Sequence, residues 1–193
     1  MSSSFLLFGA GALGTDLAIQ LLNSNNQVFL SSFDEANLNQ IKKDRENKKY
    51  LPGFRLEKDL IIQPFSEKLV EGVDSIIVCV KSPYFKDAVM ALKNSQNNKN
   101  LIWATKGFDL ESGALLSEIV SKHYGNTIEH GVLSGPTFAE ELSLSKPAAI
   151  TLATDTIKDP ASLAKKMSNE SLRVYISSDP IGVQLGGSLK NII

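Results

Sequence analysis

Gly9-Ala10-Gly11-Ala12-Leu13-Gly14 is the stretch of sequence that decides the fold. The residues before it, 5–8, form a short apolar run of strand length. Residues 12–22, which overlap its end, carry apolar side chains at helical spacing. The order is therefore strand, glycine turn, helix. In that context the G-x-G-x-x-G pattern is typical of a loop that binds a dinucleotide.

Each glycine of this loop has a separate physical role in such a site. Gly9 makes the tight turn after the strand, and Gly11 lets a pyrophosphate approach the backbone. Gly14 lets the helix pack closely against the sheet. Ala12 and Leu13 lie in the first helical turn, where free backbone N–H groups bind anions. We therefore predict that residues 9–14 bind a dinucleotide cofactor.

Strand-like and helix-like segments alternate through the rest of the chain. Further strands are predicted at 28–30, 60–62, 75–80, 101–105, 131–133, 148–152 and 172–176, and helices at 36–44, 83–93, 112–124, 137–144 and 159–167. A proline-glycine turn is predicted at 50–53. Alternation of this kind predicts an α/β protein with a Rossmann-like, open and mostly parallel sheet that has helices on both faces.

Composition excludes several other classes of protein. The 193 residues correspond to about 1.3 average domains. Twenty basic against 21 acidic side chains give no global positive field, so we expect no nucleic-acid partner. One cysteine allows no internal disulfide, and His123 and His130 have no second ligand at metal spacing, so no metal site is expected. No apolar run reaches the ~20 residues that span a bilayer, and no signal peptide is present, so we expect a cytoplasmic protein without membrane insertion.

The last residues, 180–193, read as the opening of a helix that has no cap, glycine or proline at its end. We therefore expect residues 1–179 to form the dinucleotide-binding domain. Residues 180–193 are expected to be the first turns of a helical C-terminal substrate domain, most of which is missing from this chain.

The end of the second strand bears on the choice of cofactor. Residues 30–33 read Leu-Ser-Ser-Phe and hold no carboxylate to bind the ribose of NAD. Asp34 is better placed as a helix cap. The hydroxyls of Ser31 and Ser32 are candidate donors to a 2′-phosphate, and the charged run 42–49, interpreted as a solvated helix face, adds lysines. The sequence favours NADP(H) over NAD(H).

Five motifs occur in order along the chain, and together they carry a family resemblance. They are GAGALGTDLA at 9–18, NKKYLPG at 47–53, WATKG at 103–107, SGPTFAEEL at 134–142 and GVQLGGSLKN at 182–191. This set closely resembles the bacterial type of NAD(P)-dependent glycerol-3-phosphate dehydrogenase. The resemblance runs from the glycine loop to Lys190, which is nearly the whole chain.

The resemblance implies an oxidoreductase that interconverts dihydroxyacetone phosphate and sn-glycerol 3-phosphate for phospholipid synthesis, as a homodimer. It implies that Lys190 contacts the substrate and accepts the proton in catalysis. Lys106 matches a lysine that contacts both cofactor and substrate. Gly135 and Thr137 match substrate contacts, and Ala139 matches a cofactor contact.

The resemblance also assigns Ala12, Leu13 and Phe33 to the cofactor. Relatives often carry serine and an aromatic residue at the first two positions, and histidine or arginine at the third. These departures leave hydride transfer intact and bear on the choice between NADP and NAD. Two other hypotheses stay open at this point: a related reductase such as ketopantoate reductase, and a non-catalytic dinucleotide-binding redox sensor.

Overall fold

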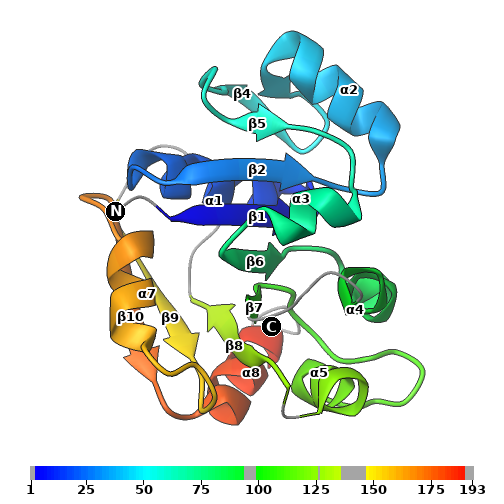
Figure 1. Ribbon diagram of the computed structural model, residues 1–193, viewed down its shortest axis with the longest axis vertical. Helices are drawn as coiled ribbons and strands as arrows, with labels where there is room; N and C mark the ends of the chain where they lie inside the picture. Colours follow the sequence, from blue (N-terminus) through cyan, green and yellow to red (C-terminus); the bar gives the residue numbers. More distant parts are fainter. Residues whose placement is uncertain (1–2, 94–98, 126, 136–146, 190–193) are drawn as a thin grey trace.

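The computed structural model describes residues 3–93, 99–125, 127–135 and 147–189. In these residues, eight strands form one sheet (Figure 1): β1 (Ser4–Phe8), β2 (Gln27–Ser31), β5 (Ile61–Ile62), β6 (Ser75–Val78), β7 (Asn100–Trp103), β8 (Glu129–Ser134), β9 (Ala148–Ala153) and β10 (Leu172–Ser177). Their order is β10-β9-β8-β7-β6-β1-β2-β5. All neighbouring pairs are parallel except β8 and β9. The predicted open, mostly parallel sheet is confirmed.

Helices cover both faces of this sheet, as predicted. One face carries α1 (Ala12–Asn23), α2 (Glu35–Asp44) and α7 (Pro160–Met167), and the other carries α3 (Glu67–Glu71), α4 (Phe85–Lys93) and α5 (Leu116–Tyr124). Figure 1 shows α4 and α5 on one side of the strands and α7 on the other. A separate apolar core lies on each side, around Leu17 and Met167 on the first and around Phe85 and Leu116 on the second.

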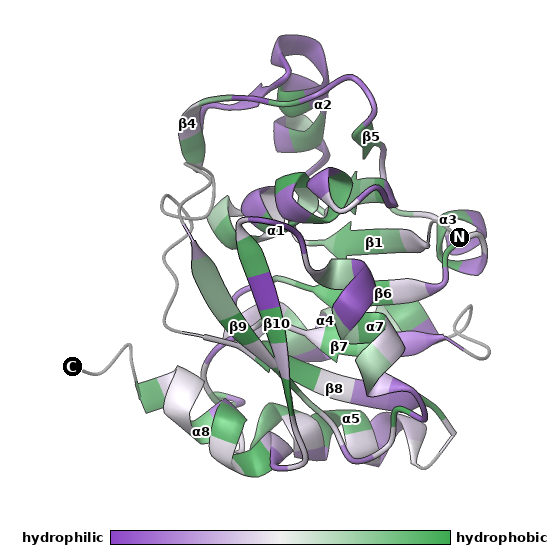
Figure 2. Ribbon diagram, turned by 90° about the vertical axis from the view of Figure 1, so that its left-hand side faces the viewer, coloured by the Kyte–Doolittle hydropathy of each residue, from purple (hydrophilic) through white to green (hydrophobic). Residues whose placement is uncertain are grey.

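The central strands are buried on both faces, which explains their continuous apolar sequences. Residues 5–8 of β1 have no exposed surface, and all four residues of β6 are buried. In Figure 2 the β1 ribbon is coloured mostly hydrophobic. These two strands are neighbours in the middle of the sheet, so the glycine loop that follows β1 starts from a fixed position.

Side-chain caps fix where several helices begin. The Asp34 carboxylate accepts the Asn37 backbone N–H at 3.0 Å and starts α2, which confirms the predicted cap. The Asp159 carboxylate accepts the Ser162 N–H at 3.0 Å and starts α7. The short helix α3 was not predicted, and it begins at a Ser66 cap.

The predicted turn at 50–53 is wrong, because these residues enter a strand. β3 (Glu46–Asn47) and β4 (Leu51–Arg55) form a separate antiparallel pair. The turn lies earlier, where the Tyr50 N–H donates to the Asn47 carbonyl at 3.2 Å. Gly53 has a φ of +85° inside β4, and its N–H donates to the Glu46 carboxylate at 2.9 Å. The glycine therefore serves an irregular strand, not a turn.

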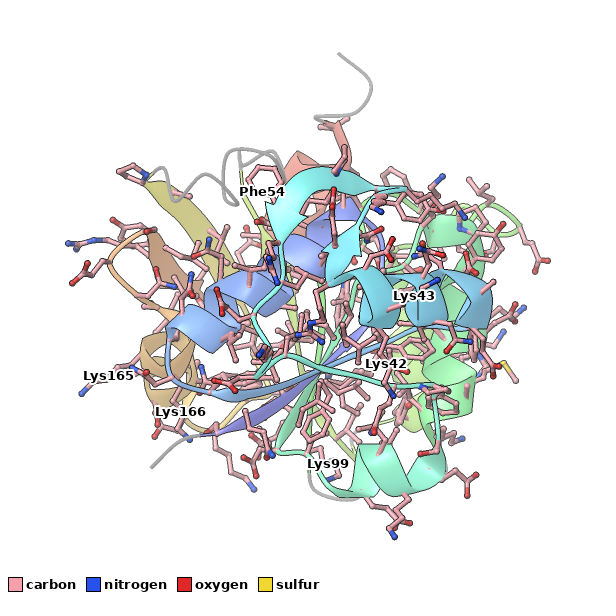
Figure 3. The ribbon with its side chains drawn as sticks, turned by 90° about the horizontal axis from the view of Figure 1, so that it is seen from above. Lys42, Lys43, Phe54, Lys99, Lys165 and Lys166 are labelled. Carbon is pink, nitrogen blue, oxygen red and sulfur yellow. The ribbon has the colours of Figure 1, made fainter. Side chains whose placement is uncertain are left out.

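The charged run 42–49 is likewise not one helix face. Lys42 and Lys43 are exposed on α2, and Figure 3 shows them well apart from Lys165 and Lys166 of α7. Arg45 has a left-handed backbone, with a φ of +53°, and ends the helix. Residues 46–49 therefore leave α2 and lead through β3 into the turn.

The helix predicted at 112–124 begins later, at Leu116. The Asp109 carboxylate accepts both the Ser112 N–H and the Ser112 hydroxyl, which holds residues 109–112 in a turn. The helix predicted at 137–144 lies outside the described residues.

Candidate active site

The carboxyl ends of five parallel strands meet at one edge of the sheet. The segments that follow β1, β2, β6, β7 and β8 are 9–11, 32–34, 79–81, 104–107 and Gly135. Ligands of open α/β sheets bind beyond this edge, near the point where the strand order reverses. That point lies between β1 and β6, next to the glycine loop.

Two glycines of the loop are required by packing. Gly9 has a φ of +121°, and a Cβ there would lie 2.7 Å from the Cys79 carbonyl carbon. A Cβ on Gly14 would overlap the carbonyl oxygen of Gly9. The turn and the first helical turn are therefore in direct backbone contact, and neither position has room for a side chain.

Gly11 differs from both, because packing does not require it. Its φ of −81° is open to any residue, and an added Cβ would meet no atom of the described residues within 4 Å. Because neither the backbone conformation nor the packing requires glycine here, the missing side chain leaves open space beside the backbone. Such space fits the close approach of a pyrophosphate.

The amino terminus of α1 is prepared for an anion. No side chain caps it at Gly11, in contrast to the carboxylate caps of α2 and α7. The first N–H groups of a helix have no partner within the helix, and the helix dipole favours negative charge there. Ala12 and Leu13, both half-buried, begin this turn. The loop and helix together fit a dinucleotide phosphate.

A pocket next to this turn joins residues that lie far apart in the sequence. It is lined by Leu13, Leu17, Ala104, Lys106, Leu133, Ser134, Gly135 and Ile150. The structure thus brings Leu13 of the glycine loop together with Lys106 and Gly135, which the family resemblance assigns to cofactor and substrate. Lys106 is half-buried, and its side chain is the cationic group of this lining.

Three other residues of the predicted site are not placed. Thr137, Ala139 and Lys190 lie outside the described residues. The helix α8 (Pro180–Leu189) contains the last described residues, and Lys190 is the next residue in the sequence.

Helix α8 is held against the sheet by two polar residues that sequence reasoning missed. The Gln184 side-chain oxygen accepts the Trp103 indole N–H at 3.3 Å and the Ser117 backbone N–H at 3.2 Å. The Ser188 hydroxyl accepts the Gly107 N–H at 3.1 Å. Both residues are buried. In the sequence they are polar residues within an otherwise apolar helical segment, and buried polar groups need hydrogen-bond partners, so this pattern is the signal that could have identified them. They connect α8 to the segment that carries Lys106.

Phe33 lies at the predicted adenosine end and is 52% exposed. Its ring packs edge-on against Phe8 at 4.9 Å and Phe65 at 5.9 Å between centroids. This aromatic cluster presents an exposed ring beyond the end of β2. An exposed aromatic ring of this kind is a stacking surface for a nucleobase.

The groups around Phe33 correct part of the cofactor interpretation. Ser31 has no exposed surface, so its hydroxyl is not available to a 2′-phosphate, and that prediction is wrong. One oxygen of the Asp34 carboxylate accepts the Asn37 N–H as the cap of α2, and the other lies 3.1 Å from the Lys49 ammonium. The Asn37 N–H first, and Lys49 next, hold the pKa of Asp34 below its ordinary value. Lys49, from the turn between β3 and β4, thus brings a cation to this end of the site.

Cys79 lies behind the glycine loop, where an added Cβ on Gly14 would be 3.1 Å from its own Cβ. Burial of its sulfur raises the pKa of Cys79 to about 12, although the residue keeps some exposed surface. At neutral pH it is therefore a thiol, not a nucleophilic thiolate. At this edge of the sheet Cys79 therefore has a packing role.

The described residues contain neither a metal-binding cluster nor a membrane-spanning helix. No group of three or more His, Cys, Asp or Glu side chains is arranged to hold a metal ion in the part of the chain that the structure describes. None of the described helices is long and apolar enough to cross a membrane.

Comparison with known proteins gives a consistent result. Residues 5–159 match the family model for the NAD-dependent glycerol-3-phosphate dehydrogenase N-terminus. The glycerol-3-phosphate dehydrogenase [NAD(P)+] of Wigglesworthia glossinidia brevipalpis is 37% identical over 191 residues, which cover 98% of this chain and 58% of that protein. The corresponding protein of Colwellia psychrerythraea is 36% identical over 195 residues, covering 100% of this chain and 58% of that protein.

A solved structure agrees with these relatives. The crystal structure of glycerol-3-phosphate dehydrogenase from Coxiella burnetii superposes with a TM-score of 0.92 at 30% sequence identity. The match covers 99% of this chain and 58% of that one. This chain therefore spans a little over half the length of the relatives that it matches.

Proposed function

Since the chain belongs to the NAD-dependent glycerol-3-phosphate dehydrogenase family, we propose that it forms the cofactor-binding part of such an enzyme. The reaction is the interconversion of dihydroxyacetone phosphate and sn-glycerol 3-phosphate, which supplies the backbone of phospholipids. The observation that carries this proposal is the pocket in which the uncapped glycine-loop helix meets Lys106. Fold alone would support many other reactions.

We propose that the cofactor lies across the carboxyl edge of the sheet. Gly9 and Gly14 shape the loop, and the N–H groups of Gly11, Ala12 and Leu13 receive the pyrophosphate. Phe33 contacts the adenosine end. When bound, the cofactor supplies or accepts the hydride at its nicotinamide.

The substrate and its proton involve residues on the other side of the pocket. Lys106 and Gly135 border the space next to Leu13, so the substrate lies within reach of both. Thr137 adds a substrate contact and Ala139 a cofactor contact. Lys190 holds the proton that moves to or from the substrate oxygen. A lysine with an ordinary pKa of ~10.4 needs that pKa lowered for this role, and we expect the positive charge of Lys106 to supply part of that effect.

The same proposal extends to the organisation of the protein. Residues 1–179 form the dinucleotide-binding domain, and residues 180–193 begin a helical substrate domain. The protein acts as a homodimer in the cytoplasm. Sedimentation of the protein expressed from its complete gene tests the dimer, and a monomer at assay concentrations would contradict it.

We further propose a preference for NADP(H), which the Lys49 ammonium supports. Residues 30–33, at the end of β2, hold no carboxylate for the ribose of NAD, and the nearest one is the helix cap Asp34. Both Asp34 oxygens are already engaged, one by the Asn37 N–H and one by Lys49. A 2′-phosphate there meets a cation and a carboxylate whose charge is balanced.

Replacing Lys49 tests this preference. K49Q should weaken NADPH binding roughly fivefold and leave NADH binding unchanged, because an exposed charge pair with phosphate is worth at most ~1 kcal/mol. Titration of the two reduced cofactors by nicotinamide fluorescence measures both values. K48Q is the matched control, since Lys48 pairs with Asp44 instead. Equal losses for NADPH and NADH would contradict the role of Lys49.

The activity itself is tested with the protein expressed from its complete gene. Dihydroxyacetone phosphate is added with NADPH, and separately with NADH, while the reduced-nicotinamide absorbance is followed. Substrate-dependent loss of absorbance supports the proposal, and the ratio of the two rates gives the cofactor preference. Cofactor binding without turnover would instead favour a redox sensor, and turnover of ketopantoate alone would favour the related reductase.

A further inference from the structure

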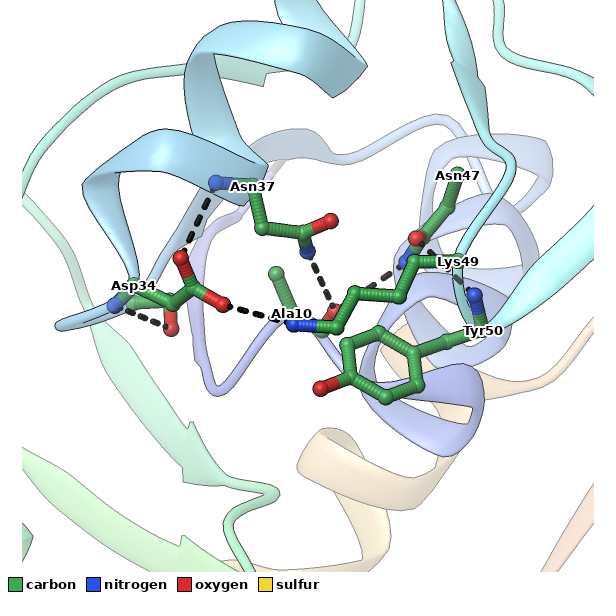
Figure 4. Close-up of polar contacts among 7 residues, drawn as sticks. Ala10, Asp34, Asn37, Asn47, Lys49 and Tyr50 are labelled. Atoms are coloured by element: carbon green, nitrogen blue, oxygen red, sulfur yellow. Dashed lines mark hydrogen bonds and ion pairs between the residues drawn. The ribbon is translucent and has the colours of Figure 1, made fainter.

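The carbonyl oxygen of Ala10, in the middle of the glycine loop, is held from outside the loop. The Asn47 side-chain amide donates to it at 3.0 Å, and the Asn37 side-chain amide approaches it at 3.4 Å (Figure 4). Ala10 is 4% exposed and both asparagines are buried. The two donors come from β3 and α2, which lie outside the strand-turn-helix unit that contains the loop.

Asn47 uses every hydrogen-bonding atom of its side chain. Its amide nitrogen donates to Ala10 and also to the Thr15 hydroxyl, at 2.7 Å. Its side-chain oxygen accepts the Tyr50 backbone N–H at 3.3 Å. Asn47 has no exposed surface, so each of these bonds is formed away from water. The side chain joins the loop, the first turn of α1 and the β3–β4 turn.

The backbone around Asn47 is fixed independently of the loop. Arg45 ends α2 in a left-handed conformation, and its guanidinium donates to the carbonyl of Leu60 at 3.1 Å. Its own carbonyl accepts the Leu56 N–H at 2.7 Å. Because these contacts anchor both ends of the β3–β4 pair, Asn47 meets the glycine loop from a preset position.

Holding the Ala10 carbonyl determines where the next N–H points. The peptide between Ala10 and Gly11 is trans, so its C=O and N–H lie in one plane and point in opposite directions. With the oxygen bound to Asn47, the Gly11 N–H points away from Asn47. Of the three glycines of the loop, Gly11 is the one at which an added Cβ would meet no atom of the described residues within 4 Å.

We propose that Asn47 is a positioning residue for dinucleotide binding, which orients the Gly11 N–H for the cofactor pyrophosphate. This inference rests on the proposed function, because it assumes that the loop binds a dinucleotide. Asn47 itself does not contact the cofactor. Preorganised donors bind an anion without reorganisation at the moment of binding, and Asn47 supplies that preorganisation.

The test compares two variants that remove parts of the same buried contact. N47L keeps the approximate shape of the side chain and removes all three of its hydrogen bonds, the two it donates and the one it accepts from the Tyr50 N–H. T15V removes the Thr15 hydroxyl and leaves the bond from Asn47 to Ala10. Both variants lose buried hydrogen bonding, so both should lower the denaturant midpoint of unfolding.

Only N47L should affect the cofactor. In the protein expressed from its complete gene, we expect NADPH to bind N47L at least about tenfold more weakly, and T15V within about twofold of the wild type. The Michaelis constant for NADPH should rise by the same factor, while kcat at saturating NADPH stays within about twofold. A purely structural role would not separate KM from kcat in one variant alone.

The outcomes distinguish this inference from the function on which it rests. Failure of the wild type to bind NADPH would overturn the proposed function itself. Wild-type binding with equal affinity losses in N47L and T15V, or with none in N47L, would overturn the role of Asn47. Should N47L not fold, N37L removes the second donor to Ala10. It must then weaken NADPH binding at least about threefold, with kcat unchanged, or the inference fails.

Discussion

One methyl group at Gly14 is expected to destabilise the fold strongly, while the same methyl group at Gly11 is expected to leave it intact. The Cβ of G14A would overlap the backbone oxygen of Gly9, which cannot swing aside as the end of a flexible side chain can. Overpacking of this kind costs about 3 kcal/mol, which outweighs the ~1 kcal/mol that alanine gains over glycine in a helix. The free energy of unfolding should therefore fall by about 2 kcal/mol. Urea denaturation of G14A and the wild type measures this difference.

G11A is the matched variant, and it should behave in the opposite way. Its Cβ meets no atom within 4 Å in the part of the chain that the structure describes, so the free energy of unfolding should stay within ~0.5 kcal/mol of the wild type. The methyl group occupies the space proposed for the pyrophosphate, so NADPH binding should weaken at least about tenfold. An unchanged affinity in G11A would place the cofactor elsewhere. A stable G14A would mean that the turn relaxes more easily than its packing implies.

The second large effect is expected at Lys190. K190A should lower kcat about a thousandfold and leave NADPH affinity nearly unchanged, because general acid–base catalysis contributes factors of this order. Steady-state rates and a cofactor titration on the same preparation measure both quantities. The role rests on the family resemblance and on the segment 182–191, whose described part packs against the Lys106 loop.

K165A is the control for this experiment. Lys165 is exposed near the end of α7, which is hydrogen-bonded to Ser24 and Asn26 at the carboxyl end of α1, whereas the glycine loop precedes the amino end of that helix. Its replacement should leave kcat unchanged. Turnover retained in K190A would contradict the assignment of Lys190 as the proton acceptor. Loss of NADPH affinity in the same variant would indicate that Lys190 contacts the cofactor instead.

Local sequence signals predicted much of this structure. The glycine loop, the continuous apolar runs of β1 and β6 and the Asp34 cap each depend on residues within a few positions of one another. Their physical causes act over that same range: hydrophobic burial, positive φ and capping. The open α/β sheet follows from the alternation of such signals.

Contacts between distant residues explain what the sequence did not reveal. β3 has two residues and β5 has two, which is too short for any periodicity to appear. The bond from Asn47 to Ala10 spans 37 positions, and that from Ser188 to Gly107 spans 81. The residues near Asn47 in the sequence do not indicate that it contacts the glycine loop. That contact forms only because the fold places β3 beside the start of α1.

The turn that carries Asn47 and Lys49 also has a consequence for protein engineering. Two residues apart in the chain, one side chain is buried under the glycine loop and the other is exposed beside Asp34. In the proposed arrangement the inward residue serves any dinucleotide, while the outward one faces the position at which NADP and NAD differ. Substitutions at the outward position are therefore the ones expected to change cofactor choice, with the inward asparagine kept as a constant part of the scaffold.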